Sequence, residues 1–196
     1  MTTRFSEQLQ AWVDSEETKT VASLFETFLS DGIAVVVVVL MAVPALPLPT
    51  GGVTHVFELV AIVLAAGLVV GREKPVRLPK RWQAQSVDKL AHSKGMRALI
   101  RLIAWLEKYS RPRGRRLLES RWFGSLAGLV IMLGTLTAFV APPFSGLDTL
   151  PALGVMFVAL SLILRDFLVF LVGCVLGGAG AALTFTLGAG LFHKLF

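Results

Sequence analysis

Two apolar stretches of this chain are each interrupted by a cluster of prolines and glycines. The first interruption, P-A-L-P-L-P-T-G-G at Pro44–Gly52, follows the apolar run Ile33–Pro44 and precedes a second run at 53–71. The other, A-P-P-F-S-G at Ala141–Gly146, lies inside the apolar region 122–165. Proline lacks a backbone donor and clashes with the preceding turn, so no regular helix continues through either cluster. The chain is therefore predicted to form two apolar helix-break-helix units.

These units predict an all-α integral membrane protein. Hydrophobic residues make up 55% of the chain and charged residues 16%, too few charges for the surface of a soluble domain of this length. Crossing the ~30 Å hydrocarbon layer takes about 20 helical residues, so Ile33–Pro44 is too short whereas 53–71 is long enough. Irregular backbone is not tolerated against lipid, so the break between them must be packed inside protein or face water. The stretches 33–46 and 122–141 are each compatible with a spanning or a re-entrant path.

Positive charge is concentrated in the middle of the chain. Residues 72–121 contain 15 of the 19 lysines and arginines but only four acids, Glu73, Asp88, Glu107 and Glu119. Because cationic loops beside apolar segments stay in the cytoplasm, this loop and the N-terminus are predicted to be cytoplasmic, in a bacterial inner membrane. The net charge of +6 is not accompanied by any helix-turn-helix, RNP or zinc-finger pattern, so anionic lipid is the expected partner rather than nucleic acid.

Two further segments have the spacing of amphipathic helices. Residues 3–29 place apolar side chains opposite acids, which predicts a helix lying on the bilayer or against the protein. Within the basic loop, the apolar face is formed by Met96, Leu99, Ile100, Leu102, Ile103 and Leu106. Largely opposite lie the cations Lys94, Arg97, Arg101 and Lys108. Such a helix, with Trp105, suits the anionic headgroups of the cytoplasmic leaflet.

The predicted organisation is one membrane domain over residues 1–196. In chain order, its parts are an amphipathic helix at 3–29, a first membrane hairpin at 33–71, the basic cytoplasmic loop at 72–121, a second hairpin at 122–165 and a C-terminal membrane segment at 167–192. The last segment is rich in glycine and fits either one long tilted span or a bent hairpin. Its small residues Gly173, Gly177 and Ala181 favour close helix packing, within the chain or in a homodimer.

The two hairpins match each other when the sequence is shifted by 94 positions. The shift pairs Pro49 with Pro143 and Gly52 with Gly146, and it aligns the apolar runs on both sides of the breaks. The shared order of apolar run, break and apolar run predicts an internal repeat. Hairpins that each enter and leave on the cytoplasmic side would be parallel repeats, whereas an odd number of crossings between them would invert one copy.

One string within residues 44–82 resembles a known family. P-A-L-P-L-P-T-G-G-V-T-H-V-F-E, followed by L-P-K-R-W, is similar to the ExoD family of exopolysaccharide synthesis proteins. The second half resembles the family more loosely, at Pro143-Phe144, Leu150-Pro151-Ala152 and Arg165-Asp166-Phe167. The resemblance implies a polytopic inner-membrane protein associated with exopolysaccharide production, with partners in polysaccharide synthesis and, in some relatives, growth at alkaline pH. It implies no reaction and carries over no catalytic residue.

His55 and Glu58 form the principal candidate for a functional site. Three residues apart at the start of 53–71, they share one helix face and can hydrogen-bond or hold a proton between them. An ionisable pair at membrane depth suggests a proton relay, whereas the structural alternative is that Glu58 complements a helix N-terminus. The matching positions in the second hairpin, Thr149 and Ala152, do not ionise, so the pair does not belong to structure that both halves share.

The breaks supply the remaining candidates for an ion or substrate site. Pro49 and the run Thr50-Gly51-Gly52 either present backbone groups to an ion, as broken helices do in transporters, or form only a tight turn. Asp148 is a further candidate, although its place before Thr149-Leu150-Pro151 is more typical of a helix N-cap.

Three charged residues are expected at the cytoplasmic ends of the hairpins. They are Arg72, Arg165 and Asp166, and an ion pair bridging the repeats is the alternative role. HExxH, GxSxG, Walker A and dinucleotide patterns are absent from the sequence, which has three scattered histidines and one cysteine, Cys174. No enzyme activity, metal or cofactor is predicted.

The sequence therefore favours a small transporter-like protein that handles protons or cations at a polar site beside the broken helices. One alternative is a membrane scaffold that binds the polysaccharide machinery through its basic helix and anionic lipid. Another is a lipid-handling protein whose hairpins thin the bilayer.

Overall fold

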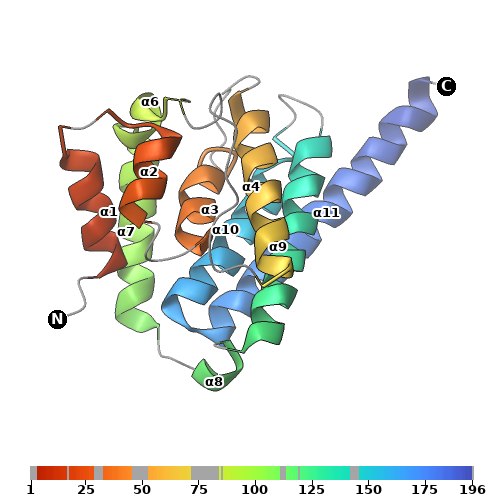
Figure 1. The fold of residues 1–196 in the computed structure, drawn as a ribbon. Helices are drawn as coiled ribbons and strands as arrows, with labels where there is room; N and C mark the ends of the chain where they lie inside the picture. The colour runs from red at the N-terminus through yellow and green to blue at the C-terminus, as the bar shows by residue number, and fades with distance from the viewer. Residues whose placement is uncertain are drawn as a thin grey trace.

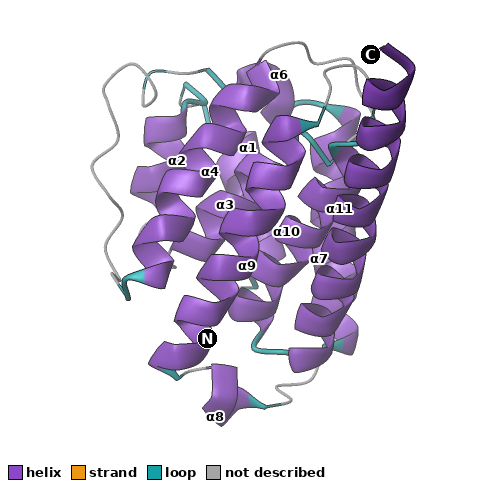
Figure 2. Cartoon of the chain, turned by 90° about the vertical axis from the view of Figure 1, so that its right-hand side faces the viewer, coloured by secondary structure: helices purple, strands orange, loops and turns teal. Residues whose placement is uncertain are grey.

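The computed structural model describes residues 4–16, 18–28, 33–45, 53–71, 84, 86–110, 114–118, 120–141 and 146–195. Every regular element in these residues is helical, which confirms the predicted all-helical class (Figures 1 and 2). The helices are α1 (Phe5–Asp14), α2 (Val21–Phe28), α3 (Ile33–Met41), α4 (Val53–Val69), α6 (Asp88–Ala91), α7 (Lys94–Tyr109), α8 (Arg115–Leu118), α9 (Arg121–Val140), α10 (Thr149–Leu164) and α11 (Phe167–Leu195).

The segment 3–29 contains two helices rather than the single one expected. α1 ends where Ser15 adopts extended backbone angles and its hydroxyl donates to the Trp12 carbonyl at 2.9 Å. α2 begins after Thr20, which exchanges hydrogen bonds with Ser23: each backbone N–H donates to the other's hydroxyl at 3.1 Å. This reciprocal cap satisfies donors that a continuing helix would have paired internally, so it starts a new helix.

The second amphipathic helix is confirmed as α7, and its apolar face lies against protein. The buried residues are Met96, Leu99, Ile100, Ile103 and Leu106. α7 packs beside α1 (Figure 1), and the two are joined where the Ser6 backbone N–H donates to Glu107 Oε1 at 3.2 Å and the Ser6 hydroxyl to Oε2. Only the polar face of α7 therefore remains available to headgroups or other partners.

α3 is the core of the molecule. All nine of its residues are buried, and Val35–Val39 have no exposed surface. It contacts α10, α4 and α2. Nine helical residues rise about 14 Å, roughly half the thickness of the hydrocarbon layer. The short first segment of the first hairpin is thus enclosed by other helices instead of facing outward.

Each helix of the first hairpin packs against a helix of the second. α3 packs on α4 and on α10, while α9 packs on α10 and on α4, so the four helices form a closed ring of neighbours. α4 and α9 are antiparallel, since Gly71 lies beside Arg121 at one end of the pair and His55 beside Phe139 at the other. The start of α4 and the end of α9 consequently lie at the same end of the bundle, the upper end in Figure 1, with α8 at the lower end.

The C-terminal segment is one continuous helix, and its small residues contact α10. A Cβ built on Gly154 of α10 would lie 2.4 Å from the Gly177 Cα, and one on Gly173 would lie 2.7 Å from the Val158 backbone nitrogen. Backbones can approach this closely only where side chains are missing. The small-residue stripe is therefore used within the chain, against α10, and the predicted dimer would need another surface.

Two of the described helices, α9 and α11, are long and apolar enough to cross a membrane. Only 33% of the most apolar stretch of α9 and 28% of that of α11 is buried, which differs from the mostly buried core helix of a soluble protein. Figure 2 views the molecule from the side on which these helices lie. Their exposed large apolar residues include Leu126, Leu129, Leu133, Leu136, Leu171, Val172, Val175, Leu183, Phe185 and Leu187.

Candidate functional site

The centre of the candidate site is the first two turns of α4. His55 and Glu58 lie on one face of the helix, as their spacing predicted, and His55 Nδ1 is 2.9 Å from Glu58 Oε2. Glu58 has no exposed surface, whereas 36% of the His55 side chain is exposed. The pair therefore joins a fully buried carboxylate to a group that the protein leaves partly uncovered.

The second carboxylate oxygen of Glu58 is the unusual feature. Oε1 is buried and contacts no hydrogen-bond donor among the described residues. Its neighbours along α4 include Phe57 and Ala61, which are apolar and buried. An ionised carboxylate left without a full set of partners in such surroundings is costly, so the site favours occupation of this oxygen by a proton or a cation.

Residues from the second hairpin complete the surroundings of the pair. The Phe139 ring, near the end of α9, meets the His55 ring edge-on with centroids 5.2 Å apart. Asp148, before the first turn of α10, lies close enough for its charge to act on Glu58. The structure thus brings His55 and Glu58 into contact and adds Phe139, which the sequence did not single out, while Asp148 lies within electrostatic range of Glu58.

Asp148 does not cap α10 with its side chain, which corrects the N-cap expectation. It is the residue before the helix, but its backbone is helical (φ −71°, ψ −27°) and no side-chain capping bond forms. Capping side chains reach the free N–H groups from extended backbone. The carboxylate of Asp148 is consequently not committed to that role.

Arg165 and Asp166 lie at the opposite end of the bundle from Glu58. Arg165 is exposed and ends α10 with left-handed backbone (φ 53°). Asp166 is buried; its Oδ1 accepts from Leu168 N–H at 3.0 Å, and its Oδ2 accepts from the Ser110 hydroxyl at 3.1 Å. Asp166 therefore starts α11 and ties it to the end of α7, a role that the sequence did not reveal.

The other predicted site residues, Pro49, Thr50, Gly51, Gly52 and Arg72, lie outside the described residues. The first four immediately precede α4 in the chain. Within the described residues, no group of three histidine, cysteine or acidic side chains is arranged to hold a metal ion. The chemistry that the described groups of this site support is the binding and exchange of protons or of weakly held cations.

Most of the chain matches a known protein family. The model of the family described as "Exopolysaccharide synthesis, ExoD" matches residues 5–186. This chain belongs to the ExoD family. It is also 27% identical over 156 residues to an uncharacterized protein of Synechocystis, slr1875, covering 78% of this chain and 72% of that protein. No solved structure matches this ExoD protein. The resemblance carried by the first break and by T-H-V-F-E is thereby confirmed, and it extends over almost the whole chain.

Proposed function

We propose that this ExoD protein is a multi-pass inner-membrane protein that handles protons or cations at Glu58, in association with exopolysaccharide synthesis. The observation that carries the proposal is the Glu58 carboxylate, which is fully buried, bonded through one oxygen to a half-exposed histidine and unpartnered at the other among the described residues. Ionisable groups at membrane depth are expensive, so they are retained mainly where a mechanism uses them.

The exposed faces of α9 and α11 support a place in the membrane. Their large apolar side chains would be solvated by lipid and would be unfavourable in water. At the end of the bundle away from the breaks, Arg116, Arg121 and Arg165 are exposed, together with Trp122. Cations and tryptophan of this kind mark the cytoplasmic interface, so we place this end inside and the breaks toward the outer side.

The repeat hypothesis agrees with this orientation. Because the start of α4 and the end of α9 lie at one end, each hairpin enters and leaves at the end where Arg116, Arg121 and Arg165 lie, as parallel repeats would. α3 then acts as a re-entrant segment that rises part of the way and returns through α4. Its enclosure by α4 and α10 supplies the protein surroundings that irregular backbone at membrane depth requires.

The His55–Glu58 pair can hold one proton in two forms, and the change from one form to the other moves the proton between the two side chains. A proton shared between Nδ1 and Oε2 is held either as an imidazole N–H donating to the carboxylate or as a carboxyl O–H donating to the ring nitrogen. His55 connects this proton to the surface, and Glu58 Oε1 offers a second position on the buried side. A cation that displaces the proton would occupy the same carboxylate, and the nearby charge of Asp148 would favour it.

The test is proton flux in proteoliposomes that contain a pH-sensitive dye, under imposed proton, sodium and potassium gradients. We expect Glu58→Gln to reduce flux to the level of empty vesicles while the protein still inserts. The chain offers a matched control in His92 and Asp88, an exposed pair 3.6 Å apart on the polar side of the molecule. Asp88→Asn removes the acid of this pair and should leave flux unchanged.

Two results would overturn the proposal. One is wild-type protein that moves none of the three ions above the empty-vesicle background. The other is equal flux in the wild type and in Glu58→Gln, because the buried carboxylate would then have no part in the movement.

A further inference from the structure

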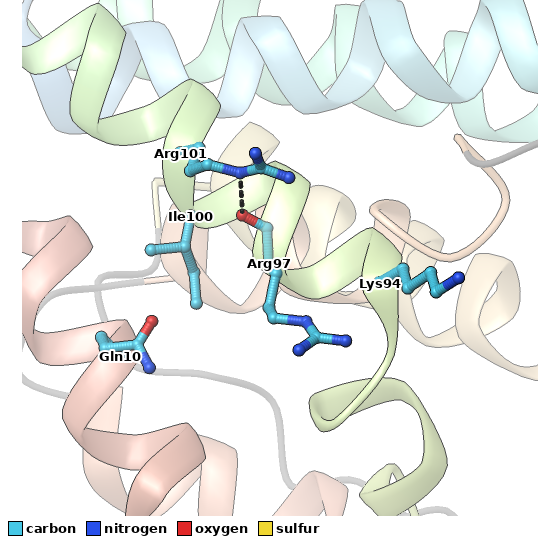
Figure 3. A pocket seen from close by; sticks show the side chains of 5 residues that line it. All are labelled: Gln10, Lys94, Arg97, Ile100 and Arg101. Carbon is cyan, nitrogen blue, oxygen red and sulfur yellow. Dashed lines mark hydrogen bonds between the residues drawn. The ribbon is translucent and has the colours of Figure 1, made fainter.

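A basic pocket lies between α1 and α7, on the polar side of the molecule (Figure 3). It has a volume of about 550 Å³ and is open to the surface, since Lys94, Arg97 and Arg101 are exposed. Its lining residues are Gln10, Lys94, Arg97, Ile100 and Arg101. None of these residues takes part in the Glu58 site.

The three cations lie along one side of α7 because the rotation of the helix is fixed. Lys94, Arg97 and Arg101 are spaced by three and four residues, so they follow one another along one side of the helix. The opposite side is held in the core, where Met96 and Ile103 are almost completely buried. Turning α7 to move the cations apart would expose this apolar face, so the cationic row is a consequence of the packing.

The wall of the pocket opposite α7 is formed by α1, which is also held in place by packing. Leu9 and Trp12 anchor α1 in the core and leave Gln10 on the side of the pocket. The Gln10 amide donates to Asp14 Oδ2 at 2.8 Å, which orients it (Figure 3 shows Gln10 facing Ile100). The bonds between Ser6 and Glu107 hold α1 against α7. A ligand would therefore meet a pocket that already exists.

No ion pair among the described residues neutralises the positive charge of the pocket. Among the described residues, the ion pairs recorded both involve a histidine, and none includes Lys94, Arg97 or Arg101. Arg101 Nε donates to the Arg97 carbonyl at 3.3 Å, which positions the guanidinium and leaves its two terminal NH₂ groups unused. Like charges one turn apart repel each other, so a bound anion would relieve a local cost.

We propose that this pocket binds a phosphate group, and that the phosphate belongs to the headgroup of an anionic lipid. Guanidinium groups match phosphate oxygens with paired hydrogen bonds, and the ammonium of Lys94 adds a mobile positive charge. Ile100 and the stems of the two arginines give the pocket an apolar part, which suits a phosphate that carries a glycerol unit better than a bare ion.

Two aromatic residues on α7 favour the lipid as the source. Trp105 and Tyr109, 56% and 59% exposed, continue the exposed side of the helix beyond Arg101, with ring centroids 5.1 Å apart. Lys108 Nζ lies 5.7 Å from the Tyr109 ring. Tryptophan and tyrosine beside cations are typical of the headgroup layer, so the pocket lies next to a surface that suits the membrane interface.

The test titrates three ligands against the purified full chain in detergent, following tryptophan fluorescence and the unfolding temperature. The ligands are short-chain phosphatidylglycerol, short-chain phosphatidylcholine and glycerol 3-phosphate. We expect phosphatidylglycerol to bind and to raise the unfolding temperature, and the double variant Arg97→Gln/Arg101→Gln to bind it roughly 10- to 30-fold more weakly. Arg97→Lys/Arg101→Lys keeps the charge but loses the paired geometry and should be intermediate.

The matched control removes two cations from the surface outside the pocket. Arg116→Gln/Arg121→Gln, at two exposed residues that do not line the pocket, has the same net charge as the arginine-to-glutamine double variant and should bind nearly as the wild type does. Binding of phosphatidylglycerol without glycerol 3-phosphate supports the site with a lipid source, and binding of both supports it with the phosphate as the main determinant. Failure of both anions to bind, or equal weakening by the control, would overturn the proposal.

Discussion

The two hairpins share a plan but differ in surroundings. In the first, α3 has nine residues and is enclosed by protein; in the second, the corresponding helix α9 has 20 residues and exposes much of its length. The first carries His55 and Glu58 at the start of α4. At the position that the 94-residue shift pairs with Glu58, the second carries Ala152, which is equally buried.

This difference distinguishes the features that the fold requires from the buried acid, which it does not require. The contacts around the ring involve both hairpins, so they are structural. The buried acid Glu58 occurs in the first hairpin alone, on α4, which packs against the enclosed helix α3. An ionisable group can be maintained there because helices rather than lipid surround it, whereas the long exposed helix of the second hairpin has the composition that lipid demands.

The largest effect is expected when an acid is placed in the second hairpin by the substitution Ala152→Glu. Ala152 has no exposed surface, so the new carboxylate would have to be buried without a partner. We expect a loss of about 3–5 kcal/mol in the free energy of unfolding, or failure to insert. Unfolding titrations in mixed micelles measure the loss, with Ala104→Glu on the exposed side of α7 as a control that should change stability by about 0.5 kcal/mol or less. A stable Ala152→Glu protein would mean that both hairpins tolerate an acid and that the asymmetry is not structural.

The second hairpin is supported by α11, which packs against α10. α10 lies against α11 through glycine, and a Cβ on Gly154 would be 2.4 Å from backbone atoms of Gly177, where neither helix can yield cheaply. Gly154→Ala should therefore cost about 1–3 kcal/mol. A Cβ on Gly178, one residue further along α11, meets nothing within 4 Å, so Gly178→Ala should be neutral or slightly stabilising. Similar thermal stability of the two variants would contradict the contact between α10 and α11.

Much of the helical framework could be predicted because it depends on local pattern. The 3.6-residue period of α7 identified its buried face, and the helices after each break begin close to the predicted positions. The spacing of His55 and Glu58 predicted that they share a face, as they do. In each case, the information lies within a few residues of the chain.

The remaining features could not be predicted from the sequence, because they depend on contacts between distant residues or on local hydrogen bonds that compete with one another. α9 is apolar on all sides, so no period shows that Gly128 faces α4 or that Phe139 meets His55. The bond between Ser110 and Asp166 joins residues 56 positions apart. The division of 3–29 into two helices arises from serine and threonine hydroxyls, which can either cap a helix or point to solvent without any change in the hydrophobic pattern.

The smallest effect expected lies where the two hairpins meet at the candidate site, in the edge-on contact of Phe139 with His55. A double-mutant cycle with Phe139→Leu and His55→Ala isolates this contact, and we expect a coupling of about 0.5–1.5 kcal/mol, because aromatic pairs contribute that much beyond the area they bury. The matched cycle pairs Phe139→Leu with His92→Ala, a histidine on the polar side of the molecule whose effect should simply add. Coupling of the same size in both cycles would show that Phe139 acts on the whole fold rather than on His55. Coupling confined to His55 would place an aromatic group of the second hairpin against the one ionisable pair of the first, where it can limit how the imidazole turns between Glu58 and the surface.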